Sequence, residues 1–332
     1  AVGRIITVPW DRATVPAASA VRNEGRGKGW LRAPVRRFTP HPMHGLLFAP
    51  LRSAGAARSE ARPEHAPLPR GGLAEREGFE PPLPLRVAPG ARVICAPLMR
   101  FTFLGTGTSQ GVPVIGCRCA VCTSSDARDR RLRTSGWLEV GGRSILIDAG
   151  PDLRQQSLRA GIDHVDAVLL THEHMDHISG MDELRSFNHR QRAVMPVHAS
   201  EATLAAVRRI YAYAFAAVRY PGVPELELHP IAPGPFTAAG VGLEAVEVLH
   251  LGMPVLGFRI GGLSYITDAK ELPPSTKERV GGSEVLVLNA LRHEPHAAHL
   301  NLEEALDLAR ELGARRTFLT HISHLLGRHA DV

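Results

Sequence analysis

The sequence predicts a layered α/β fold with mixed β-sheets, and three observations support this prediction. Short strand signals separated by turns recur along the chain from Met99 onward. Helical segments lie between these strands instead of forming a separate block, which is typical of layered α/β packing. Polar residues, above all His and Asp, gather where strands end, so a site along one edge is expected. Hairpin signals make an all-parallel, doubly wound sheet the weaker alternative.

The first 98 residues differ in composition from the rest of the chain. Before Met99 there are 15 Arg and Lys against 7 Asp and Glu, together with 14 of the 26 prolines. From Met99 onward the count is 24 Arg and Lys against 26 Asp and Glu, so the basic character belongs to the N-terminal segment. That segment has no sustained apolar period with which to offset chain entropy. We therefore predict a disordered segment at residues 1–98 and one folded domain at residues 99–332.

Two readings of the N-terminal segment remain. Residues 74–86, AEREGFEPPLPLR, resemble peptides that arise when a transfer-RNA gene is translated in a wrong frame, which would make Met99 the start and residues 1–98 non-native. A basic tail that binds nucleic acid is the alternative. The chain shows neither an export signal nor an apolar run of 18 residues, so a cytoplasmic protein without a membrane span is expected.

Local signals mark the elements in the first half of the domain. Strand signals at residues 135–140 and 143–150 flank Gly141 and Gly142, which predicts a hairpin. Residues 151–161 predict a short helix because Pro151 suits its first turn and Gly161 its end. Further strands are expected at residues 100–105, 164–172 and 196–200, and helices at residues 179–191 and 200–215.

Strands dominate the second half, and one helix is clearly marked. In residues 301–313, Asn301 is a helix-capping residue, Glu304 follows three positions later, and Gly313 ends the apolar period. Strands are expected at residues 226–231, 242–251, 255–262, 263–269, 284–291 and 315–321.

The stretch THEHMDHISG, directly after the strand at residues 164–172, carries a cluster of metal-ligand residue types. Residues two apart in an extended loop point the same way, so His172 and His174 can bind one ion. Asp176 and His177, at the following turn, then face a second ion. A polar loop with chance histidines is the alternative, but four such groups in six residues are costly to leave without partners.

Two ions need further ligands, and three candidates stand at other strand ends. His250, Asp268 and His321 each close a strand signal. A carboxylate such as Asp268 can bridge two cations and hold them about 3.5–4 Å apart. Each of these residues alone could be an ordinary polar residue at a strand end, but together they complete a set of six or seven ligands.

Three of the four cysteines lie within seven residues. Cys117, Cys119 and Cys122 form a C-x-C-x-x-C pattern, which is unsuited to a disulfide framework. Thiolates at this spacing favour zinc, and a tetrahedral zinc site requires a fourth ligand. The residues alone leave several candidates for it, and Cys95, in the N-terminal segment, is assigned no role.

These motifs resemble the metallo-β-lactamase superfamily. The signature H-x-H-x-D-H is matched at residues 172–177, and the stretches FLGTGTSQGVPVIGCRCAVC and THISH are similar to the PhnP-like branch, the phosphoribosyl cyclic phosphate phosphodiesterases. The resemblance covers about residues 99–328. It implies an αββα sandwich, in which two mixed sheets lie between helical layers. Relatives of this branch usually continue with a further strand, so truncation at the C-terminus is an expectation.

The resemblance also implies roles for single residues. One ion would be bound by His172, His174, His250 and Asp268, and the other by Asp176, His177, Asp268 and His321. His324, three positions after the last of these, would complete a structural zinc site with Cys117, Cys119 and Cys122. His299 matches the histidine beside the leaving group. Apart from the resemblance, Asp148, at the end of the strand signal at residues 143–150, is expected to orient the histidine loop by accepting a hydrogen bond.

The expected activity is the hydrolysis of a cyclic phosphodiester such as phosphoribosyl 1,2-cyclic phosphate. Two divalent ions, Mn or Zn, would activate a water molecule, with Asp268 as the bridge and His299 at the leaving group. The expected partner is a small phosphodiester substrate, without a membrane and without nucleic acid, and a homodimer stays open.

Three alternatives share the fold. A transfer-RNA 3′ endonuclease needs a basic arm, whereas residues 99–332 carry slightly more acidic than basic residues. A thioester hydrolase or a β-lactamase is the second, although a secreted β-lactamase would carry an export signal. A non-hydrolytic relative from pyrroloquinoline quinone (PQQ) biosynthesis would lack the complete H-x-H-x-D-H set.

Overall fold

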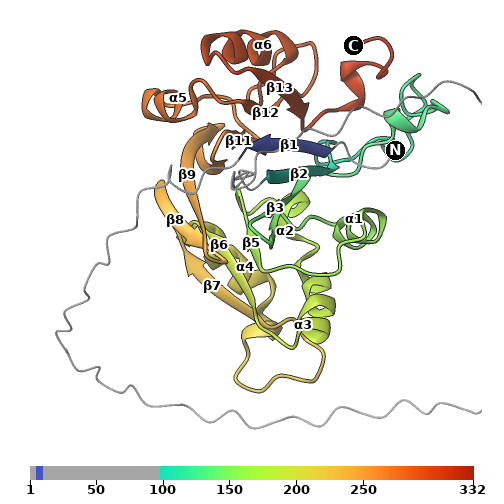
Figure 1. The fold of residues 1–332 in the computed structure, drawn as a ribbon. Coiled ribbons are helices and arrows are strands. Elements are labelled where there is room, and N and C mark those ends of the chain that lie inside the picture. The colour runs from blue at the N-terminus through green and yellow to red at the C-terminus, as the bar shows by residue number, and fades with distance from the viewer. Residues whose placement is uncertain (1–4, 10–97) are drawn as a thin grey trace, which may run out of the picture. The chain divides into compact units, whose positions relative to one another are not determined.

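The computed structural model describes residues 5–9 and 98–332, which belong to one compact unit (Figure 1). The first sheet contains β1 (Ile5–Pro9), β2 (Leu98–Gly105), β3 (Ser135–Val140), β4 (Arg143–Ile147), β5 (Ala167–Leu169), β6 (Met195–Ala199) and β7 (Leu226–Pro230), in that spatial order. The second contains, from edge to edge, β13 (Arg316–Thr320), β12 (Val285–Asn289), β11 (Leu263–Tyr265), β10 (Met253–Ile260), β9 (Val241–His250) and β8 (Gly234–Ala238). The α-helices are α1 (Leu153–Ala160), α2 (Met175–Ile178), α3 (Arg185–Gln191), α4 (Glu201–Ile210), α5 (Pro274–Val280) and α6 (Leu302–Glu311).

Both sheets are mixed, as the sequence predicts. Neighbouring strands from β1 to β4 run antiparallel, and those from β4 to β7 run parallel. In the second sheet β8 to β11 are antiparallel, whereas β12 runs parallel to both β11 and β13. Parallel neighbours bring their carboxyl ends to the same edge of the sheet, which places several loops together there.

Three apolar clusters define four layers. One cluster lies between the sheets and joins side chains such as Phe101 and Phe258 from the two inner faces. A second packs α1, α3 and α4 on the outer face of the first sheet, and a third packs α5 and α6 on the outer face of the second. Figure 1 shows α5 and α6 beside β12 and β13, away from α1 and α3. This arrangement is an αββα sandwich, so the expected fold is confirmed.

Two of the local signals have the geometry that they predict. Gly141 and Gly142 have φ of 58° and 76°, and the left-handed backbone at both positions suits the tight turn between β3 and β4. The Asn301 side chain accepts the backbone N–H of Glu304, while the Glu304 carboxylate accepts that of Asn301. The capping box therefore starts α6 where the sequence predicts it.

Two elements lack a clear signal in the sequence. Helix α5 buries little more than Thr276 and Val280, so no apolar period marks it. Strand β8 contains Pro235, a residue that disfavours a strand, yet β8 is the edge of its sheet, where proline is tolerated. In the described part of the chain, no helix combines the length and apolarity that crossing a membrane requires.

Strand β1 corrects part of the expectation for the N-terminal segment. Residues 5–9, which we expected to be disordered, pair with β2 in antiparallel register from Ile5 opposite Thr102 to Pro9 opposite Leu98. Ile6 and Val8 are buried in the core between the sheets, whereas Ile5 and Thr7 face outward. Five residues are too short a signal to predict a strand whose partner follows almost a hundred positions later. Residues 1–4 and 10–97 lie outside the described part.

The pairing of β1 predicts that Val8→Asp destabilises the domain. Val8 is fully buried, so a carboxylate there loses apolar burial and is itself desolvated, at a cost of about 2–4 kcal/mol in the free energy of unfolding. The melting temperature should fall by roughly 5–10 °C in a thermal unfolding experiment. Thr7→Asp, on the exposed face of the same strand, is the matched control and should change it little. Equal melting temperatures in both variants would mean that β1 does not pair with β2.

A histidine pair, with one ring buried and the other half-buried, lies beside the edge strand β8 of the second sheet. The His198 ring, on β6, stacks on His229, on β7, with centroids 4.8 Å apart and planes inclined by 18°, and Phe236 of β8 packs nearby. Burial, and then the neighbouring His229, lowers the pKa of His198 to about 4. The folded protein therefore holds this ring neutral.

This lowered pKa predicts a loss of stability in mild acid. An unfolded histidine titrates near 6.5, so the unfolded chain binds more protons at this residue between pH 6.5 and about 4. The contribution of neutral His198 is complete above pH 6.5 and is lost as the pH falls toward 4. The melting temperature of His198→Gln should therefore decline less over this window than that of the unchanged protein. His189→Gln, at an exposed position of α3, should show the unchanged slope, and a His198→Gln slope equal to it would refute the assignment.

Candidate metal centre

The predicted ligand residues come together at one edge of the sandwich. The loop after β5 carries His172 and the following ligand residues, and α2 begins within it. His250 is the last residue of β9, whereas Asp268 and His321 follow β11 and β13. Strand ends that are distant in sequence thus supply side chains to the same place.

A first group consists of His172, His174 and His250. One ring nitrogen from each lies within 4.8 Å of the others. The ring centroids of His174 are 4.5 Å from His172 and 5.1 Å from His250. His172 and His250 are buried while His174 is exposed, so this group is open to solvent on one side.

A second group consists of Asp176, His177, His321 and Asp268. The His177 Nε2 atom lies 3.2 Å from an oxygen of Asp176 and 3.2 Å from one of Asp268. The His321 Nε2 atom lies 3.4 Å and 3.2 Å from the same two carboxylates. Ligands 2.0–2.1 Å from a tetrahedral ion are roughly 3.3 Å apart, so these separations suit one bound ion.

Asp268 joins the two groups. Its Oδ2 atom faces His177 and its Oδ1 atom faces His321. It also forms a cluster of possible ligand atoms with His172, and another with His250. Because this carboxylate is buried between both groups, it stands where a ligand shared by two ions would stand.

The histidine nitrogens of the centre face the ligand carboxylates or are left without a partner. The Nε2 atom of His172 is buried without a hydrogen bond, and the Nε2 atom of His177 faces the carboxylates of Asp176 and Asp268. The Nδ1 atom of His250 is bound to the Ala298 carbonyl at 2.8 Å, which leaves its Nε2 atom for the centre. Buried polar atoms are rarely left unpaired, so this donor set fits divalent metal ions.

Asp148 orients His177 of the second group. It is fully buried, its Oδ2 atom accepts the Nδ1–H of His177 at 2.7 Å, and it accepts both the backbone N–H and the hydroxyl of Thr171. A carboxylate that fixes the ring of a ligand histidine is a common support of metal sites. The structure therefore places Asp148 where the sequence analysis expects it.

Three residues of the centre have left-handed backbone conformations. Asp148, Asp268 and His321 have φ of 62°, 55° and 54°. Non-glycine residues seldom adopt such values, and strained residues of this kind cluster at functional sites. Gly150 allows the backbone to approach the Asp176 loop closely, because a Cβ at this position would lie 2.0 Å from the Asp176 carbonyl oxygen.

The charges of the centre stabilise one another. Burial raises the pKa of Asp268, but the neighbouring His321 and His177 outweigh it and hold that pKa well below its usual range. Burial likewise raises the pKa of Asp176, and hydrogen bonds from His177 and His321 lower it further than burial raises it. Both carboxylates are therefore ionised at neutral pH, which is the form that binds metal.

Unlike the nearby His296 and His293, His299 packs directly against residues of both ligand groups. Its ring centroid is 4.6 Å from that of His250 and 4.7 Å from that of His321, and its Nδ1 atom is 3.7 Å from Asp268. His296 stacks on its outer side at 5.1 Å. His293 instead contacts the Leu326 carbonyl at 2.9 Å, so it supports the loop.

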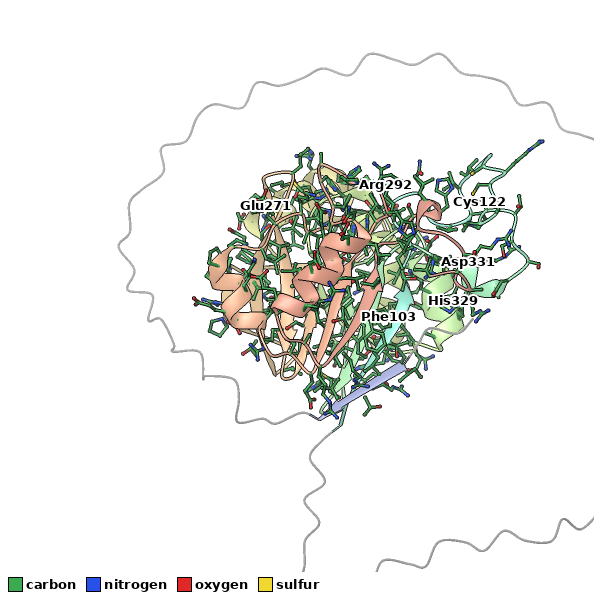
Figure 2. The ribbon with its side chains drawn as sticks, turned by 90° about the horizontal axis from the view of Figure 1, so that it is seen from above. Phe103, Cys122, Glu271, Arg292, His329 and Asp331 are labelled. Atoms are coloured by element: carbon green, nitrogen blue, oxygen red, sulfur yellow. The ribbon has the colours of Figure 1, made fainter. Side chains whose placement is uncertain are left out.

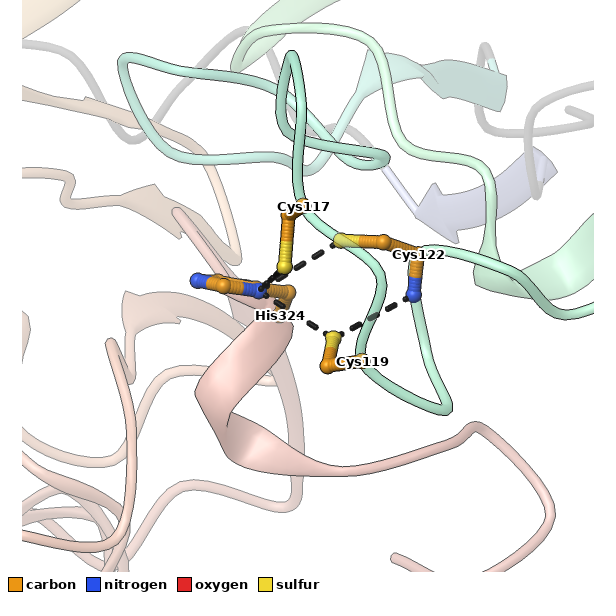
Figure 3. Close-up of side chains that lie close together, drawn as sticks. All are labelled: Cys117, Cys119, Cys122 and His324. Atoms are coloured by element: carbon orange, nitrogen blue, oxygen red, sulfur yellow. Dashed lines mark hydrogen bonds between the residues drawn. The ribbon is translucent and has the colours of Figure 1, made fainter.

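The cysteine pattern forms a separate cluster with His324. The Nδ1 atom of His324 lies 3.3 Å from the sulfurs of Cys117 and Cys119 and 3.4 Å from that of Cys122 (Figure 3). The Cys122 backbone N–H donates to the sulfur of Cys119, and together with His324 it lowers the pKa of that thiol to about 6. Four ligand atoms around one point, with a thiolate favoured, suit a structural zinc ion. We call this cluster the knuckle.

Some contributors could not be found from sequence patterns. The Ala298 carbonyl that holds His250 is a backbone group and has no signature. Thr134, 187 residues before His321, accepts the backbone N–H of His321 through its hydroxyl at 3.2 Å. Thr171 stands beside the histidine motif, and only its position after a buried strand could have suggested its role.

Comparison with known proteins identifies the family. A family model described as "Beta-lactamase superfamily domain" matches residues 143–322, which is more than half of the chain. The chain belongs to the metallo-β-lactamase superfamily. This metallo-β-lactamase-fold chain is similar to the solved structure of a diphosphatase from the PhnP family, with 38% identity and a TM-score of 0.65 over 70% of this chain and 89% of that one. The resemblance to the PhnP branch is thus confirmed.

Two curated relatives carry other names. The metallo-β-lactamase-fold chain is 41% identical over 237 residues to an octanoyltransferase of Porphyromonas gingivalis, a match covering 70% of this chain but 48% of that protein. It is 41% identical over 101 residues to coenzyme PQQ synthesis protein B of Methylobacterium nodulans, which is 26% of this chain and 34% of that protein. The chain thus spans about half of the first relative and a third of the second. The fold is that of metal-dependent hydrolases, and the substrate is a separate question.

Proposed function

We propose that the chain is a metal-dependent phosphodiesterase that hydrolyses a cyclic phosphodiester such as phosphoribosyl 1,2-cyclic phosphate. The observation that supports this most is the convergence of two ligand groups on one shared carboxylate, Asp268, with His299 beside them. Two ions that share one carboxylate can hold both the attacking and the leaving oxygen of a phosphoryl group. Similarity to the PhnP-family diphosphatase supports phosphate chemistry.

The residues present fit two divalent ions, Mn or Zn. When bound, such ions lower the pKa of a water molecule between them and neutralise charge on the phosphate. Asp268 would keep the ions together, because its negative charge lowers their mutual repulsion. Asp148 would hold the His177 ring in one orientation, and Ala298 does the same for His250. An all-nitrogen and oxygen ligand set does not discriminate between the two metals.

His299 is assigned to the leaving group. It touches the centre on the side of Asp268 and is largely buried, so a departing alkoxide at this position would meet its ring N–H. Hydrogen bonding to a developing negative charge stabilises the transition state more than the ground state. His296, stacked behind it, would keep the ring in place.

The knuckle is proposed as a structural zinc site, separate from the chemistry. Its four ligand atoms surround one point and leave no open position. It ties the loop at residues 117–122 to the turn at His324–Leu326, just after His321. The bound zinc would therefore hold two segments in place near the second ligand group.

Other activities of relatives define the alternatives. The PhnP-family relative named a diphosphatase makes a phosphoanhydride the second candidate substrate. The name octanoyltransferase belongs to a protein of which half lies outside the match, so it does not favour acyl transfer here. The PQQ-type relative matches about a quarter of this chain, and a transfer-RNA endonuclease remains the alternative that the acidic balance of residues 99–332 disfavours.

A substrate panel tests the proposal. The Mn- or Zn-loaded protein should cleave bis(p-nitrophenyl) phosphate and a ribose cyclic phosphate, and should hardly act on p-nitrophenyl phosphate or the lactam nitrocefin. The physical reason is that a phosphodiester offers one non-bridging oxygen to each ion and one leaving alkoxide to His299. A diphosphate belongs in the same panel. Cleavage of nitrocefin or of the diphosphate at a higher kcat/KM than either diester would refute the assignment.

A further inference from the structure

A cavity lies apart from the metal centre. It has a volume of about 630 Å³ and is lined by the end of β2, by β13, by the loop at residues 127–132 and by residues 326–332. Figure 2 shows two of its lining residues, Phe103 and His329, on the same side of the domain. None of the predicted metal ligands lines it. Volumes of 300–1,000 Å³ are usual for sites that bind small organic molecules.

Five arginines line this cavity, and four of them have no carboxylate partner. Arg128 forms an ion pair with Asp126. Within the described residues, Arg130, Arg131, Arg159 and Arg328 have no carboxylate oxygen within 4.0 Å. Guanidinium groups gathered without counter-charges repel one another and attract an anion. The cavity therefore carries an excess of positive charge.

Two of these arginines are held in place by neutral acceptors. Arg131, which is half-buried, donates to the Thr106 hydroxyl at 3.1 Å, and Arg159 donates to the Leu104 carbonyl. Burial lowers the pKa of Arg131, and nearby Asp129 opposes this only in part. Fixed guanidinium groups with free N–H donors suit the oxygens of a phosphate.

Part of the cavity lining is apolar. It includes the half-buried Leu132 and Leu319, beside the buried Leu104, Leu326 and Phe103. An inorganic ion would contact the arginines but would leave the two half-buried leucines against water. An apolar body attached to the anion would bury them, which is favourable in proportion to the apolar area removed from water. The lining thus matches a ligand with one anionic end and one apolar end.

From this lining we infer that the cavity binds a small organic phosphate monoester with an apolar body, at a site distinct from the metal centre. The phosphate would contact Arg130, Arg131 and Arg328, and the body would lie on Leu132 and Leu319. The cavity also adjoins the loop after β13, which carries His321. Ile322, on the cavity wall, donates its N–H to the Thr106 carbonyl at 2.8 Å. Because the metal centre also favours phosphates, the test must separate the two sites.

The experiment uses 1-naphthyl phosphate as the probe and the full chain carrying Asp268→Asn. Mild chelation that leaves the knuckle zinc bound empties the metal centre, so that it does not take up phosphate. Isothermal titration should show saturable binding. Binding of 1-naphthol and of inorganic phosphate should each be at least about tenfold weaker, since each supplies one end only. Probe binding no tighter than that of inorganic phosphate would overturn the inference.

Charge reversal at the rim provides the matched pair. Arg130 and Arg328 are exposed and make no ion pair with another described residue, so Arg130→Glu/Arg328→Glu should fold and weaken probe binding by about tenfold or more. Arg154→Glu, on the exposed face of α1 outside the cavity, should leave probe binding unchanged. Equal loss in both variants, or no loss in either, would contradict the assignment to this cavity. If the probe binds the metal-loaded protein but not the chelated protein, it occupies the metal centre. This result would also contradict the assignment to the cavity, but it would leave the proposed activity unaffected.

Discussion

Replacing Asp268 by asparagine is expected to lower kcat/KM for bis(p-nitrophenyl) phosphate on the order of a thousandfold or more. The amide keeps the size of the side chain but removes the negative charge that both ligand groups share. His177 and His321 then face a neutral group at 3.2 Å instead of a carboxylate. Two cations without a bridging charge repel each other, so metal content should fall together with the rate.

A graded series shows whether this effect belongs to the bridge. Asp148→Asn disturbs the support of His177 and Thr171 but leaves the Asp268 carboxylate in place, so a smaller loss of about 10–100-fold is expected. Asp163→Asn, at an exposed ion pair with Arg190, should leave the rate unchanged. Steady-state kinetics and metal analysis on the three variants provide the comparison. An Asp268→Asn protein with the activity of Asp163→Asn would rule out a shared carboxylate.

The second large effect is expected at the knuckle. His324→Ala removes the nitrogen that lies 3.3–3.4 Å from all three sulfurs. The binding energy of a structural zinc ion is partly folding energy, so the variant should lose one zinc per chain and melt at least several degrees lower. Metal content should fall from up to three ions to two. Phosphodiesterase activity should fall less than in His321→Ala, because the knuckle does not touch the reacting groups.

Cobalt substitution checks the identity of the fourth ligand directly. Cobalt bound by thiolates gives charge-transfer absorption, which should be present in the unchanged protein and lost in His324→Ala. His189→Ala, which removes an exposed histidine from α3, is the control and should retain it. A tight, thiolate-bound metal that persists in His324→Ala would mean that the fourth ligand is another residue.

The parts of the fold that sequence analysis predicts are those with local causes. The β3–β4 hairpin depends on two adjacent glycines, and α6 depends on a capping box spanning four residues. The pairing of β1 with β2 depends on contacts between residues almost a hundred positions apart, and no local pattern encodes it. Helix α5 is stabilised by its packing against β9 and β12 and not by an apolar period of its own.

The same distinction holds for the candidate site. The run from His172 to His177 is visible because one loop carries four ligand residue types. His250, Asp268 and His321 could be proposed only as residues at strand ends, since their convergence depends on the order of strands in both sheets. The link between Cys117 and His324 spans 207 residues, so the residues alone left the fourth ligand open and a family resemblance was needed to suggest it.

The dependence of phosphodiesterase activity on the number of bound catalytic ions tests the central claim most directly. The protein is first depleted by mild chelation that leaves the knuckle zinc bound, and Mn or Zn is then added in steps while metal content and hydrolysis of bis(p-nitrophenyl) phosphate are followed together. The two groups that share Asp268 predict little activity with one added ion per chain and full activity with two. Full activity with a single added ion, or activity that persists without any, would contradict a two-ion phosphodiesterase.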